Sequence, residues 1–98
     1  MTNANEQGVL CPEGDVVASA VPQLRSELRD LVSTGVRRLV VDMKNVQMID
    51  SAGLGLLIAA HNSLKKMDGE MSVIQASSDI LELLTTLRMN QHFKIEGQ

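Results

Sequence analysis

Asp50 and Ser51 are the residues of this chain whose types and positions best suit chemistry. They follow the apolar pair Met48-Ile49, which is typical of the end of a buried strand, and they precede Gly53 and Gly55. A carboxylate and a hydroxyl at this point can accept hydrogen bonds from the free N–H groups that begin a helix. The spacing therefore predicts a serine hydroxyl at a strand-to-helix corner, where the first helical turn carries almost no side-chain bulk.

Ordinary helix capping is the simpler interpretation of Asp-Ser before a helix. Nucleotide binding is not favoured, because Gly53-Leu54-Gly55 lacks the third glycine of the dinucleotide fingerprint and no P-loop Gly-Lys-Ser/Thr follows. A hydrolase elbow needs Gly-x-Ser-x-Gly, whereas Ser51 stands between Asp50 and Ala52. We therefore expect a binding protein that is not an enzyme and that has no cofactor.

Metal binding is not indicated either. His61 and His92 are far apart in the sequence and have no clustered carboxylates or thiols beside them. Asp15, Asp42 and Asp50 have the residue type of a magnesium cluster, but Asp42 has no second acidic neighbour. We predict instead that His61 packs on or beside the apolar face of its helix.

Composition and charge indicate an ordinary globular protein that does not bind nucleic acid. We expect a single domain over residues 1–98, with the polar, aperiodic residues 1–7 disordered. The formal charge of −3 is unsuited to displacing counterions from a phosphate backbone. Cys11 is the single cysteine, which excludes an internal disulfide. No export signal and no apolar run near the roughly 20 residues of a membrane span are visible, so we expect a cytoplasmic protein without membrane insertion.

Hydrophobic periodicity predicts strands that alternate with helices. Strands are expected at 8–11, 39–41, 71–75 and 92–95, with 39–41 buried on both faces, while Gly14 to Val17 is either a strand or a loop. Alternation with short connections implies an α/β fold with a mostly parallel sheet and right-handed crossovers. Sites in such sheets form at the carboxyl ends of strands, and Ser51 lies beyond one of those ends.

Three helices are expected between these strands. The first starts near Val21, with Ser19 as its cap, Pro22 in its first turn and Gly35 after its end. The second runs over 51–67, and its predicted inward residues are Leu54, Leu57, Ile58, His61 and Leu64. The third is capped by residues 77–79, and its predicted inward residues are Ile80, Leu83, Leu84 and Leu87.

The stretch from Val40 to Leu57 carries a family resemblance. In this stretch a predicted strand ends at Asp42, the pair Asn45-Val46 follows, and the motif Asp-Ser-x-Gly-Leu-Gly-x-Leu comes next. This string resembles the signature of STAS domains, the bacterial anti-sigma-factor antagonists, and weaker similarity covers most of the chain. The resemblance implies a single STAS-like (β-α)n superhelix with a mostly parallel sheet of four to five strands and three main helices.

The resemblance also implies a partner switch. The unmodified protein would bind an anti-sigma factor that is also a serine kinase, and so release a sigma factor. The kinase would then use its own ATP to phosphorylate Ser51 and end the interaction, and a separate PP2C-type phosphatase would restore it. The implied partner-binding residues are Asp50, Ser51, Ala52, Gly53, Leu54, Gly55, Leu56 and Asp15.

Two departures from the family pattern matter. Members usually carry Gly-x-Leu-Asp before the first helix, whereas this chain has Val17 in the acidic position and only Asp15 as a partial substitute. The N-terminal strand pair is shortened, which exposes a sheet edge and fits a monomer or weak homodimer. An unphosphorylated STAS subunit of an ABC-type membrane lipid transporter remains the alternative. Ala52 leans toward that class, whereas Gly55 favours the sigma-factor antagonists.

Overall fold

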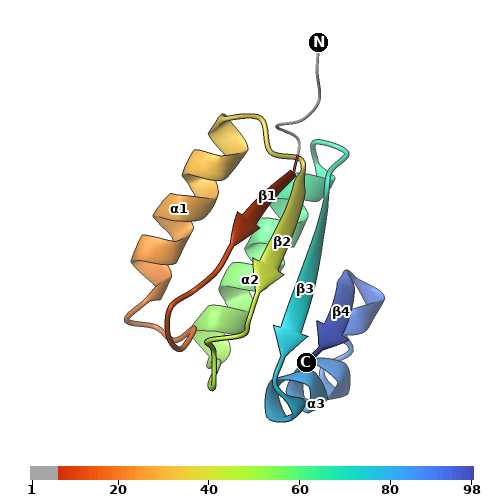
Figure 1. The fold of residues 1–98 in the computed structure, drawn as a ribbon. Coiled ribbons are helices and arrows are strands. Elements are labelled where there is room, and N and C mark those ends of the chain that lie inside the picture. Colours follow the sequence, from red (N-terminus) through yellow and green to blue (C-terminus); the bar gives the residue numbers. More distant parts are fainter. Residues whose placement is uncertain (1–6) are drawn as a thin grey trace.

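Four parallel strands form one sheet whose order, β1-β2-β3-β4, follows the order of the chain (Figure 1). The computed structural model describes residues 7–98, so the predicted disorder of residues 1–6 lies outside the described residues. The strands are β1 (Gln7–Leu10), β2 (Arg38–Asp42), β3 (Glu70–Ala76) and β4 (Lys94–Gly97). The predicted α/β class with a mostly parallel sheet is confirmed, although Gln7 belongs to β1 and not to a disordered start.

Three α-helices connect these strands: α1 (Val21–Ser33), α2 (Ser51–Lys65) and α3 (Ser78–Thr86), with a short 3₁₀ turn η2 (Met89–Gln91) before β4. Because consecutive strands are neighbours and parallel, right-handed crossovers place all three helices on the same face of the sheet. Figure 1 shows α2 behind the sheet, α1 beside the β1 edge and α3 near β3 and β4.

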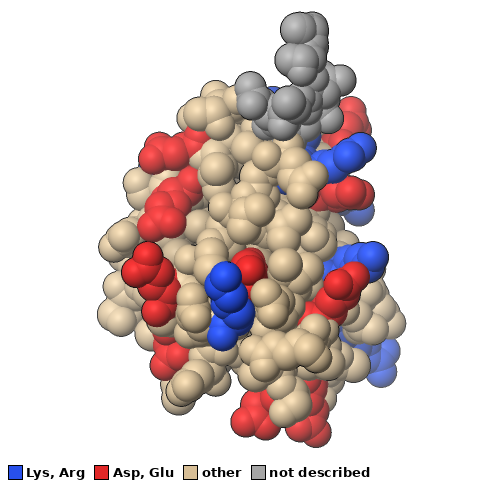
Figure 2. Space-filling model, in the orientation of Figure 1, with Lys and Arg blue, Asp and Glu red and all other residues tan. Residues whose placement is uncertain are grey.

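The two faces of the sheet differ because side chains alternate along each strand. The face toward the helices carries the core, with buried residues Leu10, Leu39, Val41, Met71 and Val73. On the other face the strand register aligns Val9 with Val40 and Val40 with Ser72. Figure 2 shows this second face as a largely uncharged surface with acidic groups along the α1 side. The prediction that β2 is buried on both faces is therefore wrong, since Val40 is only half-buried.

The predicted start and end of α1 are confirmed, but its predicted cap is wrong. Pro22 lies in the first turn, and Gly35, at φ +103°, adopts the left-handed conformation that ends the helix. Ser19 is not the cap: Ala20 occupies that position, and no side chain caps the helix. The segment before α1 is a loop in which only Val16 forms a bridge, parallel to Ile49.

The predicted inward face of α2 is correct at Leu57 and Leu64 but wrong at Ile58. Its buried residues are Gly53, Leu56, Leu57 and Leu64, whereas Ile58 is 38% exposed. Apolar residues occupy every position from 56 to 60, so the pattern alone could not define one face. In α3, Ser77 caps the helix, and Ile80 and Leu84 are buried as predicted. Leu87 lies after the last helical residue and is 43% exposed, so that prediction was wrong.

Candidate functional site

Ser51 is the first residue of α2 and is exposed. Asp50 precedes it in an extended conformation and caps the helix, because its Oδ1 accepts a hydrogen bond of 2.9 Å from the Gly53 N–H. Within residues 7–98 the hydroxyl of Ser51 has no hydrogen-bond partner, although a Ser at this position was expected to share the capping. The carboxylate of Asp50 therefore does the capping, and the Ser51 hydroxyl is free for another role.

Asp50 also joins the helix start to the loop before α1. Its Oδ2 accepts a hydrogen bond of 2.9 Å from the Ala18 N–H, and its backbone N–H donates to the Val16 carbonyl at 3.2 Å. The hydrogen bonds from Gly53, then from Ala18, lower the pKa of Asp50 below its usual value, since they stabilise the charged form. The charged carboxylate of Asp50 therefore links two segments that are distant in the sequence.

Asp15 links the start of the same loop to the segment before Ser51. Its Oδ1 accepts hydrogen bonds from the N–H groups of Gln47 and Met48 at 3.0 and 3.1 Å, and the Val16 N–H donates to the Met48 carbonyl at 3.0 Å. Asp15 is exposed, as a partner-contacting residue must be, but its carboxylate already serves a structural purpose. The loop and the segment before Ser51 consequently form one hydrogen-bonded unit.

The two glycines of the motif have different surroundings. A Cβ on Gly53 would lie 2.1 Å from the carbonyl oxygen of Val16, so only glycine lets the helix approach the loop this closely. A Cβ on Gly55 would meet no atom within 4 Å. Gly53 is therefore required by internal packing, whereas the missing side chain at Gly55 leaves open space on the outer surface.

An apolar stripe follows Ser51 along the outer side of α2. We call the residues Ser51, Leu54, Gly55 and Ile58 the outer stripe; they lie at positions i, i+3, i+4 and i+7 of one helical face. Ile58 is exposed and Leu54 is half-buried, while Met48, just before the helix, is 58% exposed. The exposure of Met48 and Ile58 was not predicted, because the sequence pattern indicated a buried strand end at Met48 and a buried helix face at Ile58.

Two other predicted contact residues are less accessible. Leu56 is 3% exposed and packs in the core, so its predicted place on the partner surface is wrong for this conformation. Ala52 is half-buried and packs against the core. The structure thus brings Asp15, Asp50, Ser51, Gly53 and Gly55 together at one corner, but it turns Leu56 away from the surface.

The remaining titratable candidates do not converge on a site. Within the described residues, no group of three or more His, Cys, Asp or Glu side chains is placed to hold a metal ion. Asp42 is buried at the end of β2, and its Oδ1 accepts a hydrogen bond from the Lys44 N–H at 3.0 Å. His61 packs against Phe93 with ring centroids 5.7 Å apart, as its predicted packing role requires. No helix within residues 7–98 has the length and apolarity that a membrane span needs.

Consecutive parallel strands, with all three helices on one face of the sheet, define a (β-α)n superhelix. Asp50 and Ser51 place its candidate site at the start of α2. Residues 2–97 match the sequence model of the STAS domain. The chain belongs to the STAS-domain family, and the resemblance seen in its sequence is confirmed.

Relatives of known name are similar over part of their length. An anti-sigma-B factor antagonist of Staphylococcus aureus is 31% identical over 67 residues, which cover 68% of this chain and 62% of that protein. BtrV of Bordetella bronchiseptica is 29% identical over 75 residues, which cover 76% of this chain and 65% of BtrV. The matched segment therefore spans slightly less than two thirds of each of these relatives.

Solved structures share the fold at low sequence identity. TM1081 of Thermotoga maritima superposes with a TM-score of 0.88 at 15% identity, over 99% of this chain and 84% of that one. The anti-sigma factor antagonist SpoIIAA in its unphosphorylated form gives a TM-score of 0.72 at 18% identity, over 100% of this chain and 84% of its own. These likenesses establish the fold.

Proposed function

We propose that this protein is an anti-sigma-factor antagonist that works by partner switching at the start of α2. In its unmodified form it binds an anti-sigma factor that is also a serine kinase, and a sigma factor is released. The kinase transfers phosphate from its own ATP to Ser51, which ends the interaction, and a PP2C-type phosphatase reverses the modification. The protein is a substrate of these partners, works in the cytoplasm and catalyses no reaction itself.

The free hydroxyl of Ser51 is the observation that carries this proposal. Asp50 caps α2, so the Ser51 hydroxyl is exposed and unbonded within the described residues at the head of the outer stripe. An ordinary capping serine would instead use its oxygen to accept a backbone hydrogen bond. The names of the S. aureus antagonist and of SpoIIAA, for which a phosphorylated form is known, support the same function.

The electrostatics of the corner are suited to a switch. A phosphate adds about −1.5 to −2 charges at neutral pH. The N-terminus of α2 stabilises an added anion, so the fold tolerates the modification. The neighbouring Asp50 is already anionic, and the outer stripe beside it is apolar. The phosphate therefore places a concentrated charge on a surface that would otherwise bury Leu54 and Ile58 against a partner, where an unpaired charge is costly.

The test combines phosphate mapping with binding. A kinase captured by the unmodified protein from a lysate of its source bacterium is purified and incubated with the protein and Mg-ATP, and the modified residue is identified by mass spectrometry. We expect phosphate on Ser51 and a loss of affinity of about a hundredfold, equivalent to roughly 2.7 kcal/mol.

Two variants provide the controls. Ser51→Ala should retain partner binding but accept no phosphate, whereas Ser63→Ala, which removes another exposed hydroxyl of α2, should behave as the wild type. Phosphate found only on Ser63, Ser77 or Ser78, or a phosphorylated protein with unchanged affinity, would refute the switch. Binding to a transporter ATPase without modification would identify the alternative class.

A further inference from the structure

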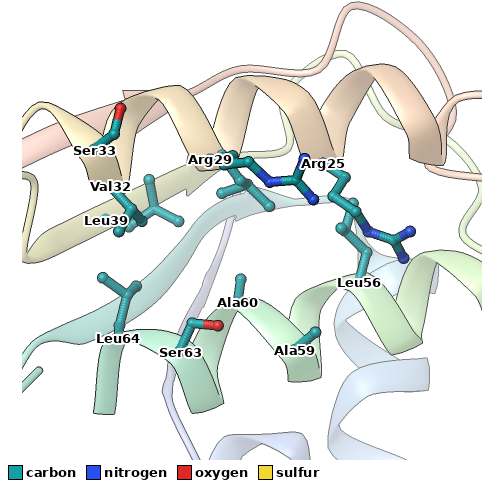
Figure 3. A pocket seen from close by; sticks show the side chains of 11 residues that line it. Arg25, Arg29, Val32, Ser33, Leu39, Leu56, Ala59, Ala60, Ser63 and Leu64 are labelled. Carbon is teal, nitrogen blue, oxygen red and sulfur yellow. The ribbon is translucent and has the colours of Figure 1, made fainter. Parts of the chain in front are cut away.

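A groove of about 370 Å³ lies between α1 and α2, on the helical side of the sheet (Figure 3). Its floor is formed by Leu39 of β2 and Leu64 of α2, which are both buried. Leu28 and Val32 line its α1 side. This volume is within the range of small-molecule sites.

Small side chains on α2 create the groove. Ala59, Ala60 and Ser63 face α1 across the gap, at positions where larger apolar residues would fill the space between the two helices (Figure 3). They occupy less than two turns of the helix. The groove therefore depends on the small size of these three side chains.

Two guanidinium groups border one end of the groove. Arg25 and Arg29 of α1 lie four residues apart, and Figure 3 shows both guanidinium groups toward the end formed by Leu56, whereas Val32, Leu39 and Leu64 line the opposite end. Neither arginine forms an ion pair with an acidic side chain of the described residues. Like charges at this helical spacing repel each other, so an anion placed between them would relieve an unfavourable interaction.

We propose that this groove binds a medium-chain carboxylate, with the carboxylate between Arg25 and Arg29 and the alkyl chain along the half-buried Val32 and Ala60. Arginine presents a planar pair of donors that matches a carboxylate. The groove has the volume of a small-molecule site, which suits an alkyl chain of medium length. The separation of charged and apolar ends selects an amphiphile over a simple anion or an uncharged hydrocarbon.

Binding of decanoate, kept below the concentration at which it forms micelles, tests the proposal by calorimetry and by backbone amide NMR. We expect saturable binding with a Kd below about 1 mM, with chemical-shift changes concentrated at Ala59, Ala60 and Ser63. Decanol should bind at least about tenfold more weakly because it lacks the charge, and acetate should show no measurable binding because it lacks the chain. The assay contains neither a kinase nor ATP, so its result is independent of the role of Ser51.

Variants of the groove give the decisive comparison. Ala60→Leu fills the groove and should abolish binding, and Arg25→Gln with Arg29→Gln should weaken it by about tenfold or more. Arg38→Gln removes an exposed arginine elsewhere and should change nothing. If Ala60→Leu lowers the thermal midpoint, Ala59→Leu, at an exposed position on the same rim, replaces it.

Several results would overturn the proposal. These are the absence of saturable binding, equal affinity for decanol, undiminished binding by the filled variants, or shifts that map to the open sheet face around Val9. Self-association of the wild type that Ala60→Leu abolishes would show that the groove is instead an interface with a second copy.

Discussion

The carboxylate of Asp50 accepts a hydrogen bond of 2.9 Å from the backbone N–H of Ala18, 32 positions earlier in the chain. Its other oxygen accepts a bond of 2.9 Å from the Gly53 N–H, which is the helix cap. One side chain thus links the loop before α1 to the start of α2. A partner that contacts Ser51 consequently meets a surface whose loop is held in place by the preceding residue.

Substitution of Asp50 separates these two hydrogen bonds. At neutral pH we expect the thermal midpoint to fall in the order wild type, Asp50→Asn, Asp50→Ala. Asparagine can keep the cap through its amide oxygen, but its amide nitrogen cannot accept from Ala18, whereas alanine loses both bonds. The matched control Asp30→Asn, on the exposed side of α1, should leave the midpoint unchanged. Identical midpoints for all four proteins would contradict the linking role.

The pH dependence of the same residue follows from its lowered pKa. The carboxyl titrates at 3.8 in the unfolded chain and lower in the folded protein, so the unfolded state binds the proton more readily. The contribution of Asp50 to stability is complete above pH 3.8 and is lost as the pH falls through the folded value. The difference in midpoint between wild type and Asp50→Asn should therefore shrink below pH 3.8. A difference that grew with acidity would be the wrong sign.

Gly53 and Gly55 should respond oppositely to alanine. Gly53→Ala places a methyl group 2.1 Å from the Val16 carbonyl and should cost about 2 kcal/mol or more, because backbone must move. Gly55→Ala projects into open space within a helix and should stabilise the protein by about 0.5–1 kcal/mol. Chemical denaturation measures both changes. If Gly55→Ala also weakens partner binding, Gly55 belongs to the interface, and similar destabilisation by both variants would refute this assignment.

Ile58 and Leu87 form a matched pair for testing the outer stripe. Both are exposed, at 38% and 43%, but only Ile58 lies on the same face of α2 as Ser51. Ile58→Ser and Leu87→Ser should each change stability by no more than about 0.5 kcal/mol. Only Ile58→Ser should weaken binding of the anti-sigma factor, measured by calorimetry. Leu56→Ala, in the core, should instead lose about 2–5 kcal/mol of stability. Equal binding by the two serine variants would exclude the outer stripe as the interface.

The sequence predicted the strands, the helices and the corner, because each has a local signal. The continuous apolar run over 39–41 identified β2, and Gly35 ended α1 through a conformation that glycine favours. The helix cap was only half predicted: Asp50 and Ser51 are both good capping residues, and propensity does not decide which of two neighbours takes the extended conformation.

Features that depend on tertiary packing could not be predicted. The hydrogen bond from Ala18 to Asp50 uses a backbone N–H that any residue supplies, so no side chain at position 18 signals it. The requirement for Gly53 arises from the Val16 carbonyl, which reaches the helix only after the chain has folded. Ile58 was placed inside because α2 is apolar on several sides, and only its position against the sheet and α1 determines which residues are buried.

The last prediction concerns His61, whose Nδ1 is buried without a hydrogen-bond partner among the described residues. Its ring lies against Phe93 and 6.0 Å from the ring of His92. Burial, then the positive charge of Lys65 and the proximity of His92, lower the pKa of His61 below 6.5. The unfolded chain therefore takes up a proton at a higher pH than the folded protein. The stability that neutral His61 provides is complete above pH 6.5 and declines as the pH falls below that value.

Thermal midpoints measured between pH 5.5 and 8 should fall with acidity in the wild type and less steeply in His61→Leu. His92→Gln, which alters an exposed neighbour, should retain most of the slope. A slope unchanged by His61→Leu would assign the acid sensitivity to another group.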